Sequence, residues 1–527
     1  MSLDKVHQPQ PNEGRLPMAW AQAPYSRSQL SIFSPSLDDT IPANHAIRQL
    51  DYVLSELDWT EWESSYNRHR GQPPIHPRLV CGCILYGILN RLGSSRQLED
   101  ATRNRIDFMW FLDGRTIDHA TFASFRKKNE KNLKLLFREV NRAAIRLSKK
   151  ALLELSADGT TMRANASRDS TRSAASIEKY LDVLDGKLAK AMSDVAHQDA
   201  LDNPEQASLK ELQKQLACLE AEKAKYKAAL KKAKRLDQAR KKKDGRKAKA
   251  ARVPLTDIDA HVLPNKEGGY APNYTPTAIV DKDTRLIVAE DVVEGFDEAS
   301  SVPPGVEAIE RDYNQRPKHV SCDGNLASGP TLEKLEEKEI NVYSTVGEKL
   351  CELVIRDDLS QPISPDVWSQ LPTTGAKKKK LARSVFIFDP DNNLYWCPMG
   401  HPLHPRKART VTDKKGNPKK VVRYVCKACG SCPLADTCLP PGRKPKTRRE
   451  IARDEYEAYR DRVVSRMSTD EGKTIYKRRK HTVETIFGYF KGVLGIRRFL
   501  SRGLNNVRNE WRWMCTAYNL RILMAMK

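Results

Sequence analysis

The chain has 527 residues, 39% hydrophobic and 30% charged, and its 91 Lys and Arg against 67 Asp and Glu give a net charge of +24. The longest apolar run covers residues 79–89, well short of the roughly 20 residues that a membrane-spanning helix needs. The N-terminal residues also lack an apolar stretch for a secretory signal. These features exclude a membrane protein and predict a cytoplasmic chain of about three domains.

The positive charge favours a nucleic acid as partner. Lys and Arg that neutralise phosphates release counterions, which gives a large affinity that does not depend on sequence. The alternative is charge that only keeps the protein soluble, for which a small domain usually carries a magnitude of about 2–8. The charge does not indicate what happens to the nucleic acid.

Residues 1–30 are rich in Pro, Gln, Asn and Ser and predict a flexible lead-in, whereas residues 31–148 predict a helical domain. Ile47, Leu50 and Leu54 recur at the spacing of one helical face. Ser95 and Asp118 each precede a helical pattern and are expected as N-caps.

The helix after Asp118 ends in three basic residues, Arg126, Lys127 and Lys128. Short helices with tight turns and basic ends are typical of a helix-turn-helix-like DNA-binding unit. A small helical bundle without DNA contacts fits the same pattern. We expect a DNA-binding domain in which these three residues contact DNA.

Residues 176–250 contain a nearly unbroken heptad pattern of apolar residues: Leu209, Leu212, Leu216, Leu219, Tyr226, Leu230 and Ala233. Such spacing predicts a helical hairpin or coiled coil inserted into another domain. A simple solvated spacer is the alternative. Neither interpretation assigns chemistry to this region.

Strand patterns occupy residues 149–175 and 251–345, and include a hairpin in which residues 278–280 and 286–289 flank a polar turn. Two strand ends resemble each other. Asp158-Gly159 follows residues 152–157, and Asp323-Gly324 follows residues 319–322. Each Gly lets the backbone turn away and leaves the carboxylate accessible.

If these two strands are neighbours, Asp158 and Asp323 come together. Like charges at that distance repel unless a cation lies between them. Mg²⁺ prefers such an oxygen-rich, partly hydrated site. Two unrelated Asp-Gly turns are the alternative.

A third acid lies in a basic helical row. Residues 480–491 read as one helix, on which Lys477, Lys480, Glu484 and Lys491 share a face. Glu484 is a candidate to complete the cation site while the Lys residues hold phosphates. The alternative is a simple i,i+4 ion pair between Lys480 and Glu484, worth about 0.2–0.5 kcal/mol.

Five cysteines cluster within residues 346–470: Cys397, Cys426, Cys429, Cys432 and Cys438. Cys-x2-Cys spacing allows two thiolates to bind one tetrahedral Zn²⁺. Four of the five are expected to hold a structural Zn²⁺. An iron–sulfur cluster or reduced, unliganded thiols are the alternatives.

Taken in order, these motifs resemble the bacterial insertion-sequence transposases of the DDE class. The segments around Asp158, Asp323 and Glu484 are similar to the family's two catalytic strands and its Glu helix, and residues 497–503 and 518–520 match its usual tail. One group of the family has a Tyr-x2-Arg-x3-Glu-x6-Lys signature. Glu484 and Lys491 meet it, but Lys480 stands where the signature has Arg, and Tyr476 is one residue too far upstream.

The resemblance implies an α/β fold. A ribonuclease H-like mixed sheet flanked by helices would comprise residues 149–175, 251–345 and 471–527. The all-α domain would cover residues 31–148. A coiled-coil insertion would cover residues 176–250, and a Cys-rich insertion residues 346–470.

The resemblance also implies an activity: cleavage and strand transfer of insertion-sequence ends, with Asp158, Asp323 and Glu484 binding two Mg²⁺ or Mn²⁺ ions. The implied partners are double-stranded DNA, both the terminal inverted repeats and the target, and a second copy of the chain in a homodimer. Lys477, Lys480 and Lys491 would contact the DNA. A catalytically silent DNA-binding relative and a coiled-coil adaptor protein are the alternatives.

Overall fold

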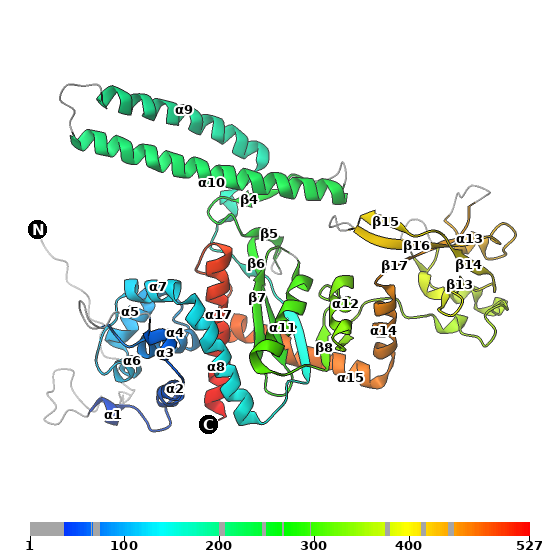
Figure 1. Ribbon diagram of the computed structural model, residues 1–527, viewed down its shortest axis with the longest axis horizontal. Helices are drawn as coiled ribbons and strands as arrows, with labels where there is room; N and C mark the ends of the chain where they lie inside the picture. Colours follow the sequence, from blue (N-terminus) through cyan, green and yellow to red (C-terminus); the bar gives the residue numbers. More distant parts are fainter. Residues whose placement is uncertain are drawn as a thin grey trace, which may run out of the picture.

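The computed structural model describes residues 36–64, 66, 74–199, 206–244, 249–265, 268–295, 297–374, 380–412, 418–440 and 447–526. The predicted lead-in, residues 1–30, lies outside this part of the chain. The fold is mixed α/β, with a helical N-terminal region, mixed sheets and a pair of long helices (Figure 1). No helix in the described residues is long and apolar enough to cross a membrane.

The N-terminal region is helical, as predicted. Ile47, Leu50 and Leu54 lie on one face of α2 and are fully buried. The eight helices are α1 (Leu37–Thr40), α2 (Ala46–Ser55), α3 (Thr60–Glu63), α4 (Pro77–Leu89), α5 (Ser95–Asn104), α6 (Ile106–Phe111), α7 (His119–Lys128) and α8 (Glu130–Ser148).

One of the two predicted N-caps is correct. The Asp118 side chain accepts a hydrogen bond from the backbone N–H of Thr121 and caps α7. The cap of α5 is Ser94, one residue before the predicted Ser95. Ser94 forms a reciprocal capping box with Gln97. Ser95 could not form one, because the residue three positions after it is the buried Leu98, which has no polar side chain to bond back to the cap.

The central sheet has the strand order β7-β6-β1-β8-β9. β1 pairs antiparallel with β6 and parallel with β8, β6 pairs antiparallel with β7, and β8 pairs parallel with β9. The predicted hairpin is confirmed as β6 and β7. The strands are β1 (Glu154–Gly159), β6 (Tyr270–Asp281), β7 (Ile287–Val293), β8 (His319–Cys322) and β9 (Asn341–Tyr343).

The N-terminal half of β6 extends the sheet. It pairs with β2 (Met162–Arg163) on one side and with β5 (His261–Pro264) on the other. The sheet is accompanied by α11 (Val302–Tyr313), which contacts β7, and by α12 (Gly329–Glu337), which contacts β9.

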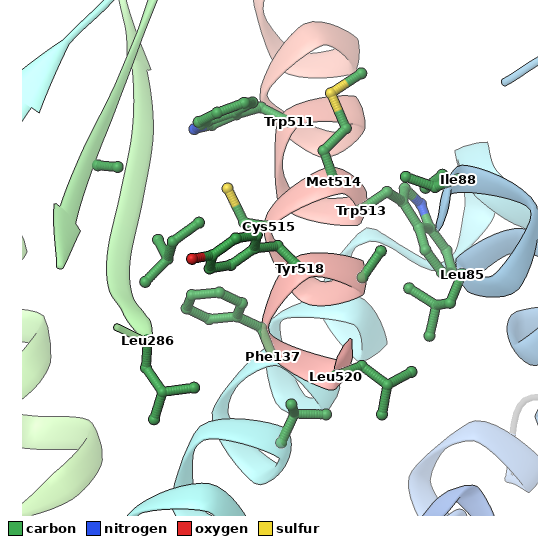
Figure 2. Packing of buried hydrophobic residues seen from close by; sticks show 14 of the residues in the cluster. Leu85, Ile88, Phe137, Leu286, Trp511, Trp513, Met514, Cys515, Tyr518 and Leu520 are labelled. Carbon is green, nitrogen blue, oxygen red and sulfur yellow. The ribbon is translucent and has the colours of Figure 1, made fainter. Parts of the chain in front are cut away.

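The C-terminal helix α17 (Leu504–Ala525) lies between the N-terminal helices and the sheet (Figure 1). It contacts β7 as well as α8 and α4. In Figure 2, Trp511, Cys515 and Tyr518 lie on the side that faces the sheet, and Trp513 lies toward Leu85 and Ile88 of α4. A single buried apolar cluster therefore joins the N-terminal helices to the sheet.

Polar groups also tie α17 to the sheet. Arg512 Nε lies 2.7 Å from Glu290 Oε1, and both side chains are almost fully buried. Asn519 donates to the carbonyl oxygen of Ile287 and accepts from its backbone N–H. Because unpaired groups are costly inside a protein, these partners fix how α17 is placed along β7.

Two long helices, α9 (Ala174–Asp199) and α10 (Gln206–Asp244), run antiparallel beside each other (Figure 1). Tyr180 stacks on Tyr226 with 4.5 Å between ring centroids, and Lys223 pairs with Asp185. The heptad positions from Leu212 to Leu230 are half-buried, and among the α10 residues whose burial is described, those from 210 to 241, full burial is confined to Ala229 and Ala233. Leu209 lies outside these residues.

A second sheet lies toward the right of Figure 1, with strand order β12-β13-β14-β16-β15 and β17 paired to β16. It has its own apolar cluster. Its strands are β12 (Ile387–Asp389), β13 (Leu394–Trp396), β14 (Pro402–Pro405), β15 (Arg409–Thr412), β16 (Pro418–Cys426) and β17 (Glu450–Asp454). From β17 the chain returns through α14 (Glu457–Ser468) and α15 (Asp470–Arg479) to the central sheet.

Candidate active site

Asp158 and Asp323 stand at the ends of two neighbouring parallel strands. β1 and β8 are in register through Ala157 and Cys322, and the two Asp residues directly follow that pair. Two positions earlier on each strand, the buried hydroxyls of Ser156 and Ser321 lie 2.8 Å apart. Strand side chains alternate between faces, so the carboxylates project on the same side as this Ser pair.

The two Asp-Gly steps share one hydrogen bond. Asp158 Oδ1 accepts a hydrogen bond of 2.8 Å from the backbone N–H of Gly159, and Asp323 Oδ1 accepts one of 2.7 Å from Gly324. The expected turn is present at Gly324 but not at Gly159, which is still part of β1 and pairs with Thr277. Each carboxylate is thus held against the next residue, with its second oxygen left for another partner.

Glu484 lies in a helical run that is not a regular α-helix. After α15, residues Lys480–Glu484 form a π-helical turn, followed by α16 (Thr485–Gly488) and a second π-helical turn over Tyr489–Val493. The prediction of one regular helix over residues 480–491 is therefore wrong in detail. Val483, Phe487, Phe490 and Leu494 of this run are all buried.

The π turn brings Arg479, which the sequence pattern did not single out, between two of the acids. Arg479 Nη1 lies 3.0 Å from Asp158 Oδ2, and Nη2 lies 3.0 Å from Glu484 Oε1. Glu484 pairs with Arg479 and not with Lys480, so the i,i+4 pair considered as the alternative is absent. The side chain of Arg479 is only 10% exposed.

A signal for Arg479 is present in the sequence. Tyr476-x2-Arg479 has the spacing of the family signature, with one extra residue before Glu484. A π turn accommodates one extra residue in a helix, and such turns are frequent at functional sites. The Arg479 guanidinium also lies over the Tyr476 ring, 5.7 Å from its centroid.

The charges around Asp158 oppose one another. Burial raises the pKa of Asp158, while the Gly159 N–H and the Arg479 guanidinium lower it. The nearby charges of Glu484 and Asp323 raise it further. Asp158 therefore lies within electrostatic reach of both other predicted acids.

A fourth carboxylate, Glu298, reaches the same place from the short helix η3 (Glu298–Ser301) after β7. A Cβ added to Gly159 would lie 2.8 Å from Glu298 Cδ, so this carboxyl group packs against the Gly159 backbone. Burial, reinforced by the charges of Asp158 and Asp323, raises the pKa of Glu298 to about 7. No motif marks Glu298, because only the fold brings it to the Asp residues.

The donor set suits a hard divalent cation. All four groups are carboxylates, and the charge of Asp323 raises the pKa of both Asp158 and Glu298, a repulsion that a shared cation would relieve. Among the described residues, no group of three or more His, Cys, Asp or Glu side chains is placed so that all of them could hold the same metal ion. Arg479 supplies the compensating positive charge between Asp158 and Glu484.

The predicted Lys residues have different surroundings. Lys491 Nζ donates to Thr160 Oγ1 at 2.6 Å and to the Thr161 carbonyl at 2.8 Å, which ties its helix to the chain just after Asp158. Lys477 and Lys480 are exposed. Gly488, one turn after Glu484, has open space where a Cβ would be.

The other predicted DNA contacts, Arg126, Lys127 and Lys128, form the last turn of α7, as expected. They come from the N-terminal helices and belong to a different part of the fold from the acids. Asn509 of α17 donates to the Arg126 carbonyl at 2.6 Å, which joins the end of α7 to the C-terminal helix.

The five clustered cysteines all border one small cavity of about 20 Å³ in the second sheet region. Backbone N–H groups point at two of the sulfurs. The His401 N–H lies 3.3 Å from Cys397 Sγ, and the Arg449 N–H lies 3.4 Å from Cys429 Sγ.

Comparisons with known proteins give two matches. A family model described as a transposase DDE domain matches residues 396–524, which include the cysteines, Glu484 and α17. A second model, described as a transposase domain (DUF772), matches residues 35–128, the N-terminal helices. Neither the search of curated proteins nor the search of solved structures gave a match.

Proposed function

Because the chain belongs to the insertion-sequence transposases of the DDE class, we propose that it cuts DNA at the ends of its element and joins them to a target, using Asp158, Asp323 and Glu484 as catalytic acids. The observation that carries this is the placement of Asp158 and Asp323 at adjacent parallel strand ends, with Glu484 joined to Asp158 through Arg479.

The strand order supports a ribonuclease H-like core. Numbered within the sheet in chain order, β7-β6-β1-β8-β9 is 3-2-1-4-5, with an antiparallel meander followed by two parallel strands. The strands numbered 1 and 4 in this count are β1 and β8, whose ends carry Asp158 and Asp323. α9–α10 and the second sheet would then be the two insertions, the first after β1 and the second before the Glu484 helix.

Asp158, Asp323 and Glu484 would hold two Mg²⁺ or Mn²⁺ ions. When bound, the ions activate the attacking oxygen and stabilise the leaving oxygen of a phosphodiester. The chain itself orients the acids. The Gly159 and Gly324 N–H groups fix the Asp carboxylates, Arg479 keeps Asp158 facing Glu484, and Lys491 holds the backbone after Asp158.

The Lys side chains would contact DNA around these acids. Lys477 and Lys480 are exposed on the same helical run as Glu484, and Arg126, Lys127 and Lys128 would extend the contact to the N-terminal helices. Neither a silent relative nor a coiled-coil adaptor accounts for four carboxylates gathered at one edge of the sheet.

We further infer that Glu298 is a fourth acid of the metal site. Glu298→Gln should weaken Mg²⁺ binding about tenfold, as changes around metal ligands commonly do. Without metal it should raise the melting temperature at pH 8. The folded state favours the protonated form of Glu298, because its pKa is raised to about 7. The free energy of unfolding therefore falls as pH rises through about 7 and Glu298 ionises in its buried place, whereas the Gln variant stays neutral and does not lose this stability.

The Glu298 measurement is a thermal melt across a Mg²⁺ series at pH 8. Asp297→Asn, which changes an exposed acid one residue away, is the matched control and should behave as wild type. If Glu298→Gln shows the wild-type Mg²⁺ dependence, Glu298 is not part of the site.

We also propose that four of Cys397, Cys426, Cys429, Cys432 and Cys438 hold a structural Zn²⁺, supported by their convergence on one small cavity. Purified wild-type protein should contain about one Zn²⁺ per chain by mass spectrometric metal analysis, and Cys429→Ser should contain nearly none. Cys218→Ser, which changes an exposed cysteine of α10, should keep it. Wild-type protein that is free of zinc and iron would disprove the site.

A further inference from the structure

A cleft with a basic lining separates the N-terminal helices from the segment that precedes α17. It has a volume of about 730 Å³, and its charged lining, here termed the basic cleft, comprises Arg91, Arg126, Lys127, Arg497, Arg498 and Arg502. These residues come from the α4–α5 turn, from the end of α7 and from residues 497–502. The cleft is therefore produced by the fold and not by one local run of charge.

Three cations of the basic cleft have no ion-pair partner among the described residues. Arg91, Lys127 and Arg498 are exposed and form no ion pair within the described part of the chain. Among the described residues that line the cleft, Glu510 is the single acid. Its carboxylate accepts hydrogen bonds from the backbone N–H groups of Leu500 and Ser501, which tie Glu510 of α17 to the loop that precedes this helix.

Hydrogen-bond donors in the wall of the cleft lack partners. Arg126 donates from Nη1 to the Gly93 carbonyl at 2.8 Å, but its Nε and Nη2 are buried and make no hydrogen bond to any described residue. The same holds for Trp513 Nε1. Buried donors without acceptors are costly, and most of all on a charged group. An anion with several acceptor oxygens would satisfy them.

The segment that forms one wall of the cleft lies beside the chain that follows Asp158. Beyond Asp158 the chain passes into β2, where the Arg163 N–H bonds to the Arg497 carbonyl and the Phe499 N–H bonds to the Arg163 carbonyl. Residues 497–499 therefore lie beside β2. Arg163 lies five positions after Asp158, an extended distance of at most about 17 Å, which is about five base pairs of DNA.

We propose that the basic cleft binds the sugar–phosphate backbone of the element's end, within about five base pairs of the bond that is cut. This rests on the proposed function for the identity of the DNA. Its physical basis is separate: exposed cations without an ion-pair partner among the described residues, buried donors without an acceptor, and a wall that is bonded to β2 just after Asp158. The contacts are to phosphates, so they hold DNA in place without reading its sequence.

The test measures binding alone, in a Glu484→Gln background that cannot cut. Lys127→Gln and Arg498→Gln change exposed cleft residues and should fold normally. Fluorescence anisotropy over a salt series would follow each variant on a duplex carrying the element's end and on a random duplex of equal length. Lys150→Gln after α8, which changes an exposed cation outside the cleft, is the control.

Each cleft variant should lower affinity equally on both duplexes and reduce the slope of log affinity against log salt by about 0.9, the change expected when one phosphate is no longer neutralised. Neutral methylphosphonates within about five base pairs of the cut should weaken binding of the parent protein, and Arg498→Gln should add little to that effect. Unchanged binding and slope in both variants, or a weakening confined to the end sequence, would overturn the cleft assignment.

The two proposals fail in different ways. If the cleft variants lose affinity as expected but the protein with its acids intact never cuts the element's end, the catalytic proposal fails and the cleft stands. If the protein cuts that end while the cleft variants bind like the parent, only the cleft assignment fails.

Discussion

Asp158→Asn, Asp323→Asn and Glu484→Gln should each bind the element's end with wild-type affinity and cut it at least about 10²–10³-fold more slowly, since several kcal/mol of transition-state stabilisation depend on the ions that these acids hold. Each change keeps the shape of the side chain and removes one negative charge. The measurement is cleavage of a labelled end duplex in Mg²⁺, beside a gel-shift assay of the same protein.

Asp283→Asn provides the matched control. Asp283 is an exposed acid in the β6–β7 turn, beside the start of β1, where Leu155 pairs with Asp281, whereas Asp158 lies toward the other end of β1. The control variant should cut at the wild-type rate. Full cleavage by any one of the three acid variants would remove that residue from the catalytic set.

Arg479→Gln should lower the free energy of unfolding by about 3 kcal/mol in the absence of divalent metal. Removing one partner of a buried ion pair leaves the other charge uncompensated, and Asp158 is only 17% exposed. Mg²⁺ should restore much of the loss, because a cation between Asp158 and Glu484 replaces the positive charge of the guanidinium. Urea unfolding with and without saturating Mg²⁺ measures both effects.

Arg478→Gln is the neighbouring control, since Arg478 is exposed and pairs with Glu154 on the far side of the acids. It should unfold like the wild type, with the same response to Mg²⁺. An Arg479→Gln deficit of equal size with and without Mg²⁺ would mean that the guanidinium has only a structural role.

Much of the architecture follows from local pattern. The helical face of Ile47, Leu50 and Leu54, the Asp118 cap and the β6–β7 hairpin depend on neighbours in the sequence. The predicted cap of α5 is wrong by one residue, because two adjacent Ser residues differ only in which of them has a Gln three positions later. The order of strands in the sheet is set by long-range packing, which periodicity does not contain.

The candidate site likewise contains residues that the sequence pattern predicts and residues that it does not. Asp158 and Asp323 are recognisable from their matching strand ends, and Glu484 from its motif. Arg479 is not predicted, because the sequence pattern assumes 3.6 residues per turn throughout, whereas this helix contains a π turn. Glu298 has no sequence signal, since it reaches Gly159 only once β6 has paired with both β1 and β7, from which the chain leads into η3.

Helix α17 has a consequence for where DNA would be cut. One of its sides is buried against α4 and the other against the sheet, within one continuous apolar cluster. The N-terminal helices cannot swing relative to the acids without exposing that cluster to water. The distance between the site that holds the DNA and the acids that cut it would then be fixed by the fold. The cut would therefore fall at a constant number of base pairs from the bound site.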